Sequence, residues 1–180
     1  LQFENSRLIA RFSRPSGAYV DVLSIAKFSS APDPGAYYLE VIANERDDYY
    51  LPSGEAPGRW IGAGAERLGL TGQVEADALS SVIEGLDPSS GEPLTRWRKI
   101  KGFDLTLSAP KSVSLLWGLG DTELAADVVA AHEAAVTAAV RYLEDEACVV
   151  RRGKAGAARH QGGGLVSAAF RHRTSREADP

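Results

Sequence analysis

The sequence predicts an α+β fold in which an antiparallel sheet is flanked by helices. Residues 102–108 alternate between apolar and polar side chains, as a half-buried strand does. Residues 121–146 have the spacing of a long helix. Two short apolar runs, 148–152 and 165–172, flank a glycine-rich loop, as the strands of a hairpin do. Strands and helices mixed in this order favour the α+β class.

The first third of the chain contains one predicted strand and one predicted helix. Residues 1–21 show no clear periodicity and are interpreted as a non-native N-terminal extension, so the domain is expected over 22–180. Residues 22–28 fit a short strand. The turn residues of 30–35 precede a helix expected over 36–43.

The middle third is predicted to consist of short helices and loops. A loop rich in proline and glycine is expected over 51–64, around Trp60. Short helices are expected over 66–70 and 74–86, before the alternating strand.

Two helices are predicted after that strand. Ser108 is the expected N-cap of a short helix that ends near Trp117, and Asp121 is the expected N-cap of the long helix. The long helix has a stripe that is expected to face the core: Leu124, Val128, Ala131, Ala135, Ala138 and Tyr142. On the last strand, alternate residues share a face: Val166, Ala168, Phe170 and His172.

The composition is that of an ordinary globular protein, with 44% hydrophobic and 24% charged residues among 180. No apolar run approaches the ~20 residues that a membrane-spanning helix needs. Cys148 is the only cysteine, which excludes an internal disulfide and a cysteine-based zinc cluster. We expect a reducing compartment, the cytoplasm.

Charge is segregated along the chain, although the net charge is only −4. Residues 37–87 contain ten acidic and three basic residues, whereas 147–176 contain seven basic residues and no acidic one. A further basic cluster lies within 96–101. Such segregation can create a phosphate-binding surface on an acidic protein, and solvated loop charges are the alternative explanation.

Two tyrosine pairs, Tyr37-Tyr38 and Tyr49-Tyr50, are the first candidates for chemistry. A tyrosine hydroxyl can attack a phosphodiester and form a covalent phosphotyrosine. Because its ordinary pKa is ~10, it needs a nearby base or cation to react at neutral pH. Packing at a surface is the commoner role of paired tyrosines.

Asp104 and His172 are the next candidates. Asp104 is the one carboxylate on the polar face of its strand, where it can act as a general base, orient a histidine, or remain a satisfied polar group. His172 ends the last strand, but one histidine does not make a metal site. His132 is interpreted as a structural helix residue and His160 as a surface residue.

Three separated motifs, in the same order, resemble the TrwC-like (MobF-type) conjugative relaxases. They are the two tyrosine pairs, the run Gly102–Ser114 (GFDLTLSAPKSVS), and the segment Phe170–Pro180 (FRHRTSREADP). A block at Trp60–Ala65 is also similar to that family. The resemblance covers about 22–180.

The resemblance implies a histidine-hydrophobic-histidine endonuclease built on an antiparallel sheet. Such a relaxase nicks one strand of plasmid DNA and stays linked to the 5′ end through a tyrosine. Tyr37 would be the first nucleophile and Tyr49 the second, with Tyr38 and Tyr50 as their neighbours. Asp104 would help to activate the tyrosine or to orient a histidine.

A divalent metal ion (Mg, Mn or Zn), with His172 as its first ligand, is implied as the cofactor. The implied partners are single-stranded DNA at a transfer origin and other conjugation proteins. The basic residues expected to hold the DNA backbone are Arg96, Arg98, Lys99, Lys101, Lys111, Arg151, Arg152, Lys154, Arg171, Arg173 and Arg176.

The family motif continues with further histidines beyond the point at which this chain ends, Pro180. The sheet and the metal site are therefore expected to be incomplete, and these 180 residues alone are expected not to nick DNA. A truncated, catalytically inactive DNA-binding remnant of a relaxase is the alternative function.

Overall fold

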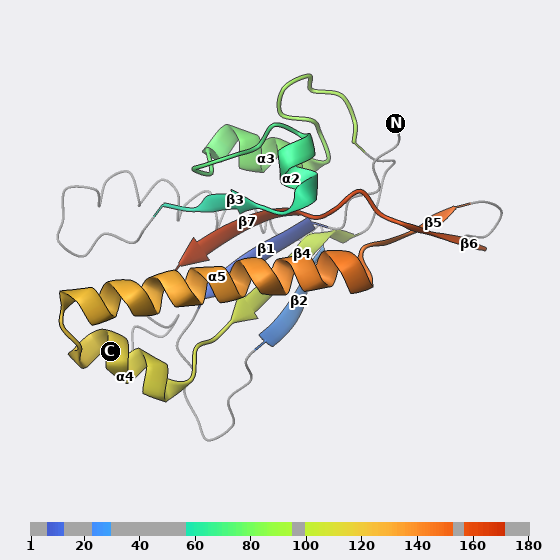
Figure 1. Ribbon diagram of the computed structural model, residues 1–180. Helices are drawn as coiled ribbons and strands as arrows, with labels where there is room; N and C mark the ends of the chain where they lie inside the picture. Colours follow the sequence, from blue (N-terminus) through green and yellow to red (C-terminus); the bar gives the residue numbers. More distant parts are fainter. Residues whose placement is uncertain (1–6, 13–22, 30–56, 95–99, 153–156, 172–180) are drawn as a thin grey trace.

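The computed structural model describes residues 7–12, 23–29, 57–94, 100–152 and 157–171 (Figure 1). Its centre is a five-stranded sheet with the strand order β2-β4-β1-β7-β3. Those strands are β1 (Arg7–Phe12), β2 (Leu23–Ser29), β3 (Arg59–Ile61), β4 (Ile100–Leu107) and β7 (Val166–Arg171). A separate two-stranded ribbon is formed by β5 (Val149–Arg152) and β6 (Ala158–Gln161).

The α+β class is confirmed, and the sheet contains both kinds of pairing. β2 pairs with β4 and β3 with β7 in antiparallel fashion, as the sequence predicted for the sheet. β1 lies between β4 and β7 and runs parallel to both. β1 comes from the segment in which the sequence pattern indicated no element, because its apolar residues Leu8 and Ile9 are adjacent and show no alternation.

Helices cover both faces of the sheet (Figure 1). The long helix α5 (Thr122–Ala147) lies across one face, and α2 (Ala63–Arg67) and α3 (Ala76–Glu84) lie on the other. A shorter helix, α4 (Lys111–Leu119), connects β4 to α5 and packs against α5. No helix among the described residues combines the length and the apolar character that crossing a membrane requires.

The N-cap of α5 agrees with the sequence, whereas the N-cap of α4 does not. Asp121 accepts a hydrogen bond from the backbone N–H of Leu124 at 2.8 Å, which satisfies one of the free donors of the first turn. The N-cap of α4 is Pro110, and no side chain caps that helix. Ser108 was therefore the wrong choice, because β4 ends at Leu107 and the helix begins only after Pro110, two residues beyond Ser108.

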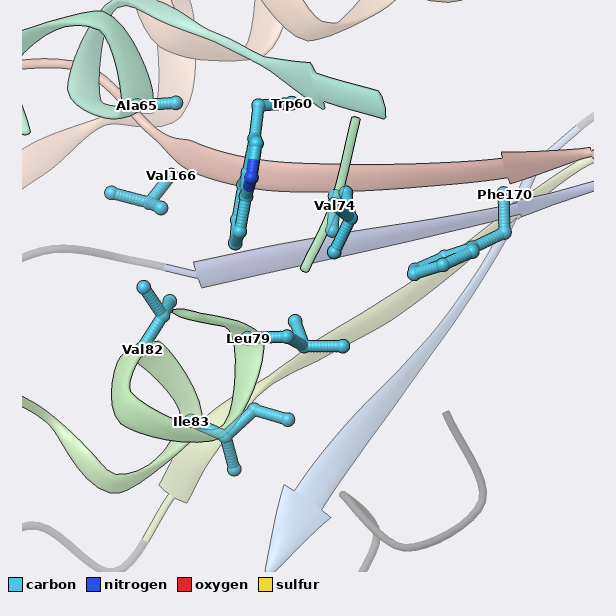
Figure 2. Close-up of a cluster of buried hydrophobic side chains, with 9 residues drawn as sticks. Trp60, Ala65, Val74, Leu79, Val82, Ile83, Val166 and Phe170 are labelled. Carbon is cyan, nitrogen blue, oxygen red and sulfur yellow. The ribbon is translucent and has the colours of Figure 1, made fainter. Parts of the chain in front are cut away.

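One core lies between the sheet and α2–α3. Trp60 and Phe170 come from neighbouring strands, and they pack against the buried side of α3 (Figure 2). The members of this cluster, which we call the Trp60 core, are Trp60, Ala65, Val74, Leu79, Val82, Ile83, Val166, Ala168 and Phe170. The shared face predicted for Val166, Ala168 and Phe170 is confirmed.

A second core, the α5 core, lies on the opposite face. It consists of Ile61, Leu105, Val136, Val140, Cys148, Leu165 and Ala169. The predicted stripe on α5 was wrong: Leu124 is 39% exposed and Tyr142 is 66% exposed. The buried stripe includes Val136 and Val140 instead. A helix rich in alanine has more than one apolar face, and the face with the larger aliphatic side chains packs against the sheet because it buries more apolar surface.

Two predicted loops contain strands. β3 and the start of α2 lie within the loop predicted over 51–64. β6 lies inside the loop predicted between the last two strands, so β5 pairs with β6 rather than with β7. Both strands have only three or four residues, too few for a pattern of alternation to stand out.

Candidate functional site

Asp104 lies in the middle of β4. Its side chain is on the face opposite to Phe103 and Leu105, because successive strand residues point to opposite faces. The sequence pattern predicted a wet environment, but the residue is buried, with only 8% of its surface exposed. Burying a carboxylate is costly unless hydrogen bonds or a charged partner compensate for the lost water.

The strand register places Asp104 in one row across the whole sheet. Its register partners are Ala26 on β2 and Ile9 on β1. The row continues through Ala168 on β7 to Trp60 on β3. Asp104 therefore lies on the same side of the sheet as the Trp60 core, two strands away from β7.

Four of the five predicted catalytic residues and the predicted metal ligand His172 lie outside the described part of the chain; the four are Tyr37, Tyr38, Tyr49 and Tyr50. The same is true of several predicted DNA-binding residues: Arg96, Arg98, Lys99, Lys154, Arg173 and Arg176. Asp104, Lys101, Lys111 and Arg171 are described with their side chains, and Arg151 and Arg152 through the strand they belong to. The described residues therefore give the frame of the predicted site, with Asp104 as its one described catalytic candidate.

Two of the described basic residues form ion pairs with carboxylates. Lys101 Nζ lies 2.7 Å from Glu84 Oε1 on α3, and Arg171 Nη1 lies 3.0 Å from Glu133 Oε1 on α5. Lys111, the first residue of α4, is exposed. Exposed ion pairs contribute at most about 1 kcal/mol to stability, so these two mainly fix where each cationic group lies.

Arg59 and Arg171 contact the same turn of α5 from two neighbouring strands. Arg59 on β3 donates from Nη2 to the backbone oxygen of Glu133 at 3.2 Å and to Thr137 Oγ1 at 3.1 Å. Arg59 lies opposite Ala169 in the register, so both arginines point toward the α5 face of the sheet. Their guanidinium groups therefore both meet α5 at Glu133.

His132 lies next to this cluster on α5 and is half-buried. Burial lowers the pKa of its imidazole below the ordinary 6.5, and the charge of Arg171 lowers that pKa further, while Glu133 opposes both effects. A positive local potential and partial burial thus favour the neutral ring.

The ribbon β5–β6 extends away from the sheet (Figure 1). The register puts Arg151 directly opposite Arg159, and Val150 opposite His160. Like charges in direct opposition destabilise a strand pair, which makes an anionic ligand a fitting partner for this ribbon. Gln161 anchors its base, since Nε2 donates to the backbone oxygen of Glu144 at 2.7 Å.

Glu144 joins three elements at the other end of α5. Its Oε1 accepts hydrogen bonds from the backbone N–H of Ala63 at 2.7 Å and of Leu165 at 2.8 Å. Gly62 has a φ of +101°, and a Cβ on Gly64 would lie 2.7 Å from the backbone of Leu165. The glycines of the Trp60–Ala65 block therefore allow α2 to approach the start of β7 closely.

The described residues do not form a metal centre by themselves. Within the ranges that the structure describes, no group of three or more His, Cys, Asp or Glu side chains is placed to hold a metal ion. His160 is exposed, as predicted, but it lies on the strand β6 and not in a loop. His132 is a helix residue, also as predicted.

Sequence reasoning missed the residues that tie α5 to the sheet. Arg59, Glu133, Thr137 and Glu144 received no role, and neither did Arg159 on the ribbon. The spacing of Glu133 and Thr137, four residues apart, was an available signal, because such residues lie on one face of a helix. Their partner Arg59 lies more than 70 residues earlier, and sequence spacing does not reveal such a contact.

Comparison with known proteins connects this frame to one family. The pattern of the TrwC relaxase family matches residues 32–180. The multifunctional conjugation protein TraI of Escherichia coli (strain K12) is 39% identical over 164 residues, which is 88% of this chain and 9% of TraI. A second TraI protein from Escherichia coli is 38% identical over the same length.

Solved structures of the conjugative relaxase TrwC are similar in fold. A metal-free complex of TrwC with oriT DNA has a TM-score of 0.64 and 32% identity, and covers 88% of this chain and 52% of its own. A copper-bound TrwC–oriT complex has a TM-score of 0.65 and 35% identity, and covers 88% and 54%. This chain thus spans about half the length of the solved relatives.

Proposed function

Because the chain belongs to the TrwC relaxase family, we propose that it forms part of a conjugative DNA relaxase, which cuts one strand of plasmid DNA at a transfer origin. The family match over residues 32–180 carries this proposal. The relatives support the substrate, since one TrwC structure contains a 27-mer DNA with the recognition hairpin and the cleavage site. The cytoplasm, where plasmid DNA resides, is the proposed location.

The proposed reaction is a transesterification. The phenolic oxygen of a tyrosine attacks the scissile phosphorus, a Tyr O–P bond forms, and the bond from phosphorus to the 3′ oxygen breaks. The 3′ end leaves as a hydroxyl, and the 5′ end stays on the protein. Tyr37 is the proposed first nucleophile and Tyr49 the second, with Tyr38 and Tyr50 beside them.

Asp104 is the proposed helper of the nucleophile. A phenol with a pKa of ~10 is mostly protonated at neutral pH, so a base or a cation must assist its attack. The burial of Asp104 at the centre of β4 supports this role, because a carboxylate in a buried position holds its place and its charge is poorly screened. Orientation of His172 is the other role proposed for it.

The basic residues are the proposed contacts with DNA. The opposition of Arg151 and Arg159 supports the ribbon β5–β6 as one contact, because a two-stranded ribbon fits the major groove of a duplex segment. Arg152 and Lys154 belong to the same proposed contact. The remaining basic residues would contact the phosphates of the DNA backbone: Arg96, Arg98, Lys99, Lys101, Lys111, Arg171, Arg173 and Arg176.

A divalent metal ion is part of the proposal, since metal-bound structures of TrwC exist. Bound near the scissile phosphate, such an ion would offset the charge that develops there. Mg, Mn and Zn are the proposed candidates, and His172 is the proposed ligand. The described residues do not themselves form the ligand set. Other conjugation proteins are proposed partners at the origin.

Formation of a covalent protein–DNA adduct tests the proposal. The chain is incubated with fluorescent single-stranded oligonucleotides of randomised sequence and a divalent cation, and the products are separated under denaturing conditions. We expect the chain to bind DNA, and we expect an adduct only when the chain is extended by the further histidines of the family motif. Replacing Tyr37, Tyr38, Tyr49 and Tyr50 with Phe should abolish the adduct.

The matched control is Tyr142→Phe, which removes the same hydroxyl from an exposed residue of α5. An adduct that survives in the fourfold variant would refute the tyrosine mechanism. Strong cleavage by the 180 residues alone would refute the prediction that they are inactive. DNA binding without any adduct, in the extended chain as well, would favour the DNA-binding remnant.

A further inference from the structure

We propose that Arg59 and Arg171 form a binding site for a phosphate group of the DNA backbone, supported from behind by α5. The inference rests on the proposed function and deepens it, because it assigns a phosphate contact to a residue outside every basic cluster of the sequence. Arg59 lies on β3 within the acidic segment 37–87, and no motif pointed to it.

The first observation is that the two guanidinium groups converge. Arg59 reaches the backbone oxygen of Glu133 at 3.2 Å, and Arg171 reaches the side chain of the same residue at 3.0 Å. They come from adjacent antiparallel strands and point to the same face of the sheet. Both cationic groups therefore lie at one residue of α5, where like charges repel and an anion is stabilised.

The second observation is that the charge is not balanced within the described residues. Arg59 bonds there only to neutral oxygens, the carbonyl of Glu133 and the hydroxyl of Thr137. Glu133 is the one described carboxylate that pairs with Arg171. Two cations therefore share one anion, and an added phosphate would complete the balance. Burial is the main cause of the lowered pKa of His132, and the positive charge of Arg171 lowers that pKa further.

The third observation concerns the remaining donors. Arg171 uses Nη1, and Arg59 uses Nη2, for every hydrogen bond they make to described residues. A guanidinium group has five N–H donors, so each arginine retains donors for a ligand. The Arg171 side chain is 26% exposed, which leaves it reachable from solvent. Planar guanidinium groups fixed in place suit the recognition of phosphate oxygens.

Thr137 and Glu133 act as supports in this arrangement. Thr137 Oγ1 donates to the backbone oxygen of Glu133 at 2.9 Å and accepts from Arg59, so it holds the Arg59 side chain against α5. Glu133 holds Arg171. Both arginines thus lose much of their rotamer freedom before a ligand arrives, which reduces the entropic cost of binding.

Anisotropy of fluorescent single-stranded DNA, measured over a range of salt concentrations, tests the site in the full 180-residue chain. Arg59→Gln and Arg171→Gln should each weaken binding about three- to tenfold and lower the slope of log affinity against log salt by about 0.7, the value for one lost contact to a single strand. Arg141→Gln is the matched control, because it removes the same charge from an exposed position of α5.

Two further arms complete the design. Arg59→Lys and Arg171→Lys keep the positive charge. Thermal melting identifies any Gln variant that fails to fold, and the affinity of the Lys variant at that position is then measured in its place. Inorganic phosphate, added at constant ionic strength, should compete with DNA only at millimolar concentrations if the site is built for a nucleic-acid backbone. Competition by micromolar phosphate would instead show that the site binds free phosphate.

The outcomes separate this inference from the proposed function. If folded Arg59→Gln and Arg171→Gln bind DNA as Arg141→Gln does, the phosphate site is wrong. If Arg151→Gln nevertheless weakens binding, the proposed DNA-binding function stands without it. If the unmodified chain does not bind single-stranded DNA at any salt concentration, both proposals fail.

Discussion

The two faces of the sheet are held to their helices by different forces. On one face, the Trp60 core is apolar throughout, and its members fill the space between β7, β3 and α3 (Figure 2). On the other face, the smaller side chains of the α5 core are accompanied by polar contacts from Arg59, Arg171 and Glu144. Packing excludes water but lacks direction, whereas hydrogen bonds fix the position of a helix along its axis.

This difference indicates where function can reside. A closely packed apolar face tolerates little change, so it serves as a scaffold. A face with half-exposed charged groups has donors and charges that a ligand can use. The proposed phosphate site lies on the α5 face, while Asp104 lies on the same side as the Trp60 core. Asp104 is not a member of the Trp60 core and lies two strands away from β7, so the scaffold and the proposed helper of the nucleophile occupy different parts of that face.

The largest expected effect comes from truncating Phe170 on the packed face. Its surface is fully buried, and its ring fills the space beside Gly58, where a Cβ would lie 2.3 Å from Cε1 of the ring. Phe170→Ala should lower the free energy of unfolding by about 3–5 kcal/mol. Urea denaturation followed by Trp fluorescence measures this loss. A loss below about 1 kcal/mol would show that packing does not dominate this face.

Removal of the Glu144 carboxylate should cost less. Glu144→Ala leaves the N–H groups of Ala63 and Leu165 without their acceptor, and each part-buried donor contributes about 1 kcal/mol. We expect a total loss of about 1–3 kcal/mol in the same denaturation experiment. Glu146→Ala, an exposed neighbour on the same helix, is the control. Equal losses in the two variants would mean that the carboxylate contacts do not hold α5.

Stability should decrease in mild acid because of His132. The pKa of its imidazole is lower in the folded protein than the ordinary 6.5, so the folded state binds fewer protons than the unfolded state. The stabilising contribution is therefore present above pH 6.5 and is lost as the pH falls below it. Melting temperatures between pH 8 and pH 5 measure the effect. His132→Gln should flatten this profile.

The smallest expected effect is at Ser167. Its side chain is completely buried, and its Oγ has no hydrogen-bond partner among the described residues. Ser167→Ala removes a polar atom that lost its contact with water on folding, so stability should stay within about 1 kcal/mol or rise. Thermal melting measures this change. A clear loss would indicate that the hydroxyl has a partner in the folded protein.

The elements with strong periodicity could be predicted from the sequence. The strand around Asp104 and the cap at Asp121 depend on local spacing, and both are confirmed. β1, β3 and β6 were missed because three to six residues carry too little pattern. The buried stripe of α5 was misplaced because alanine fits either environment, so the distinction depends on where Val136 and Val140 meet the sheet.

The candidate site was predictable only in part, for a related reason. Motifs pointed to Asp104, and charge runs pointed to Arg171, since both signals lie within short stretches of sequence. The contact between Arg59 and Glu133 joins residues 74 positions apart, and it arises from the order of strands in the sheet. A single sequence contains no local trace of such a contact.

Glu144 Oε1 accepts two backbone hydrogen bonds, and this affects hydrogen–deuterium exchange. The amides of Ala63 and Leu165 are separated by most of the domain's sequence, yet both are protected by one carboxylate oxygen. When the C-terminal turns of α5 lift from the sheet, both amides are released in the same event. They should therefore exchange at a common opening rate, so that one local fluctuation of a helix end is recorded at the start of α2 and at the start of β7.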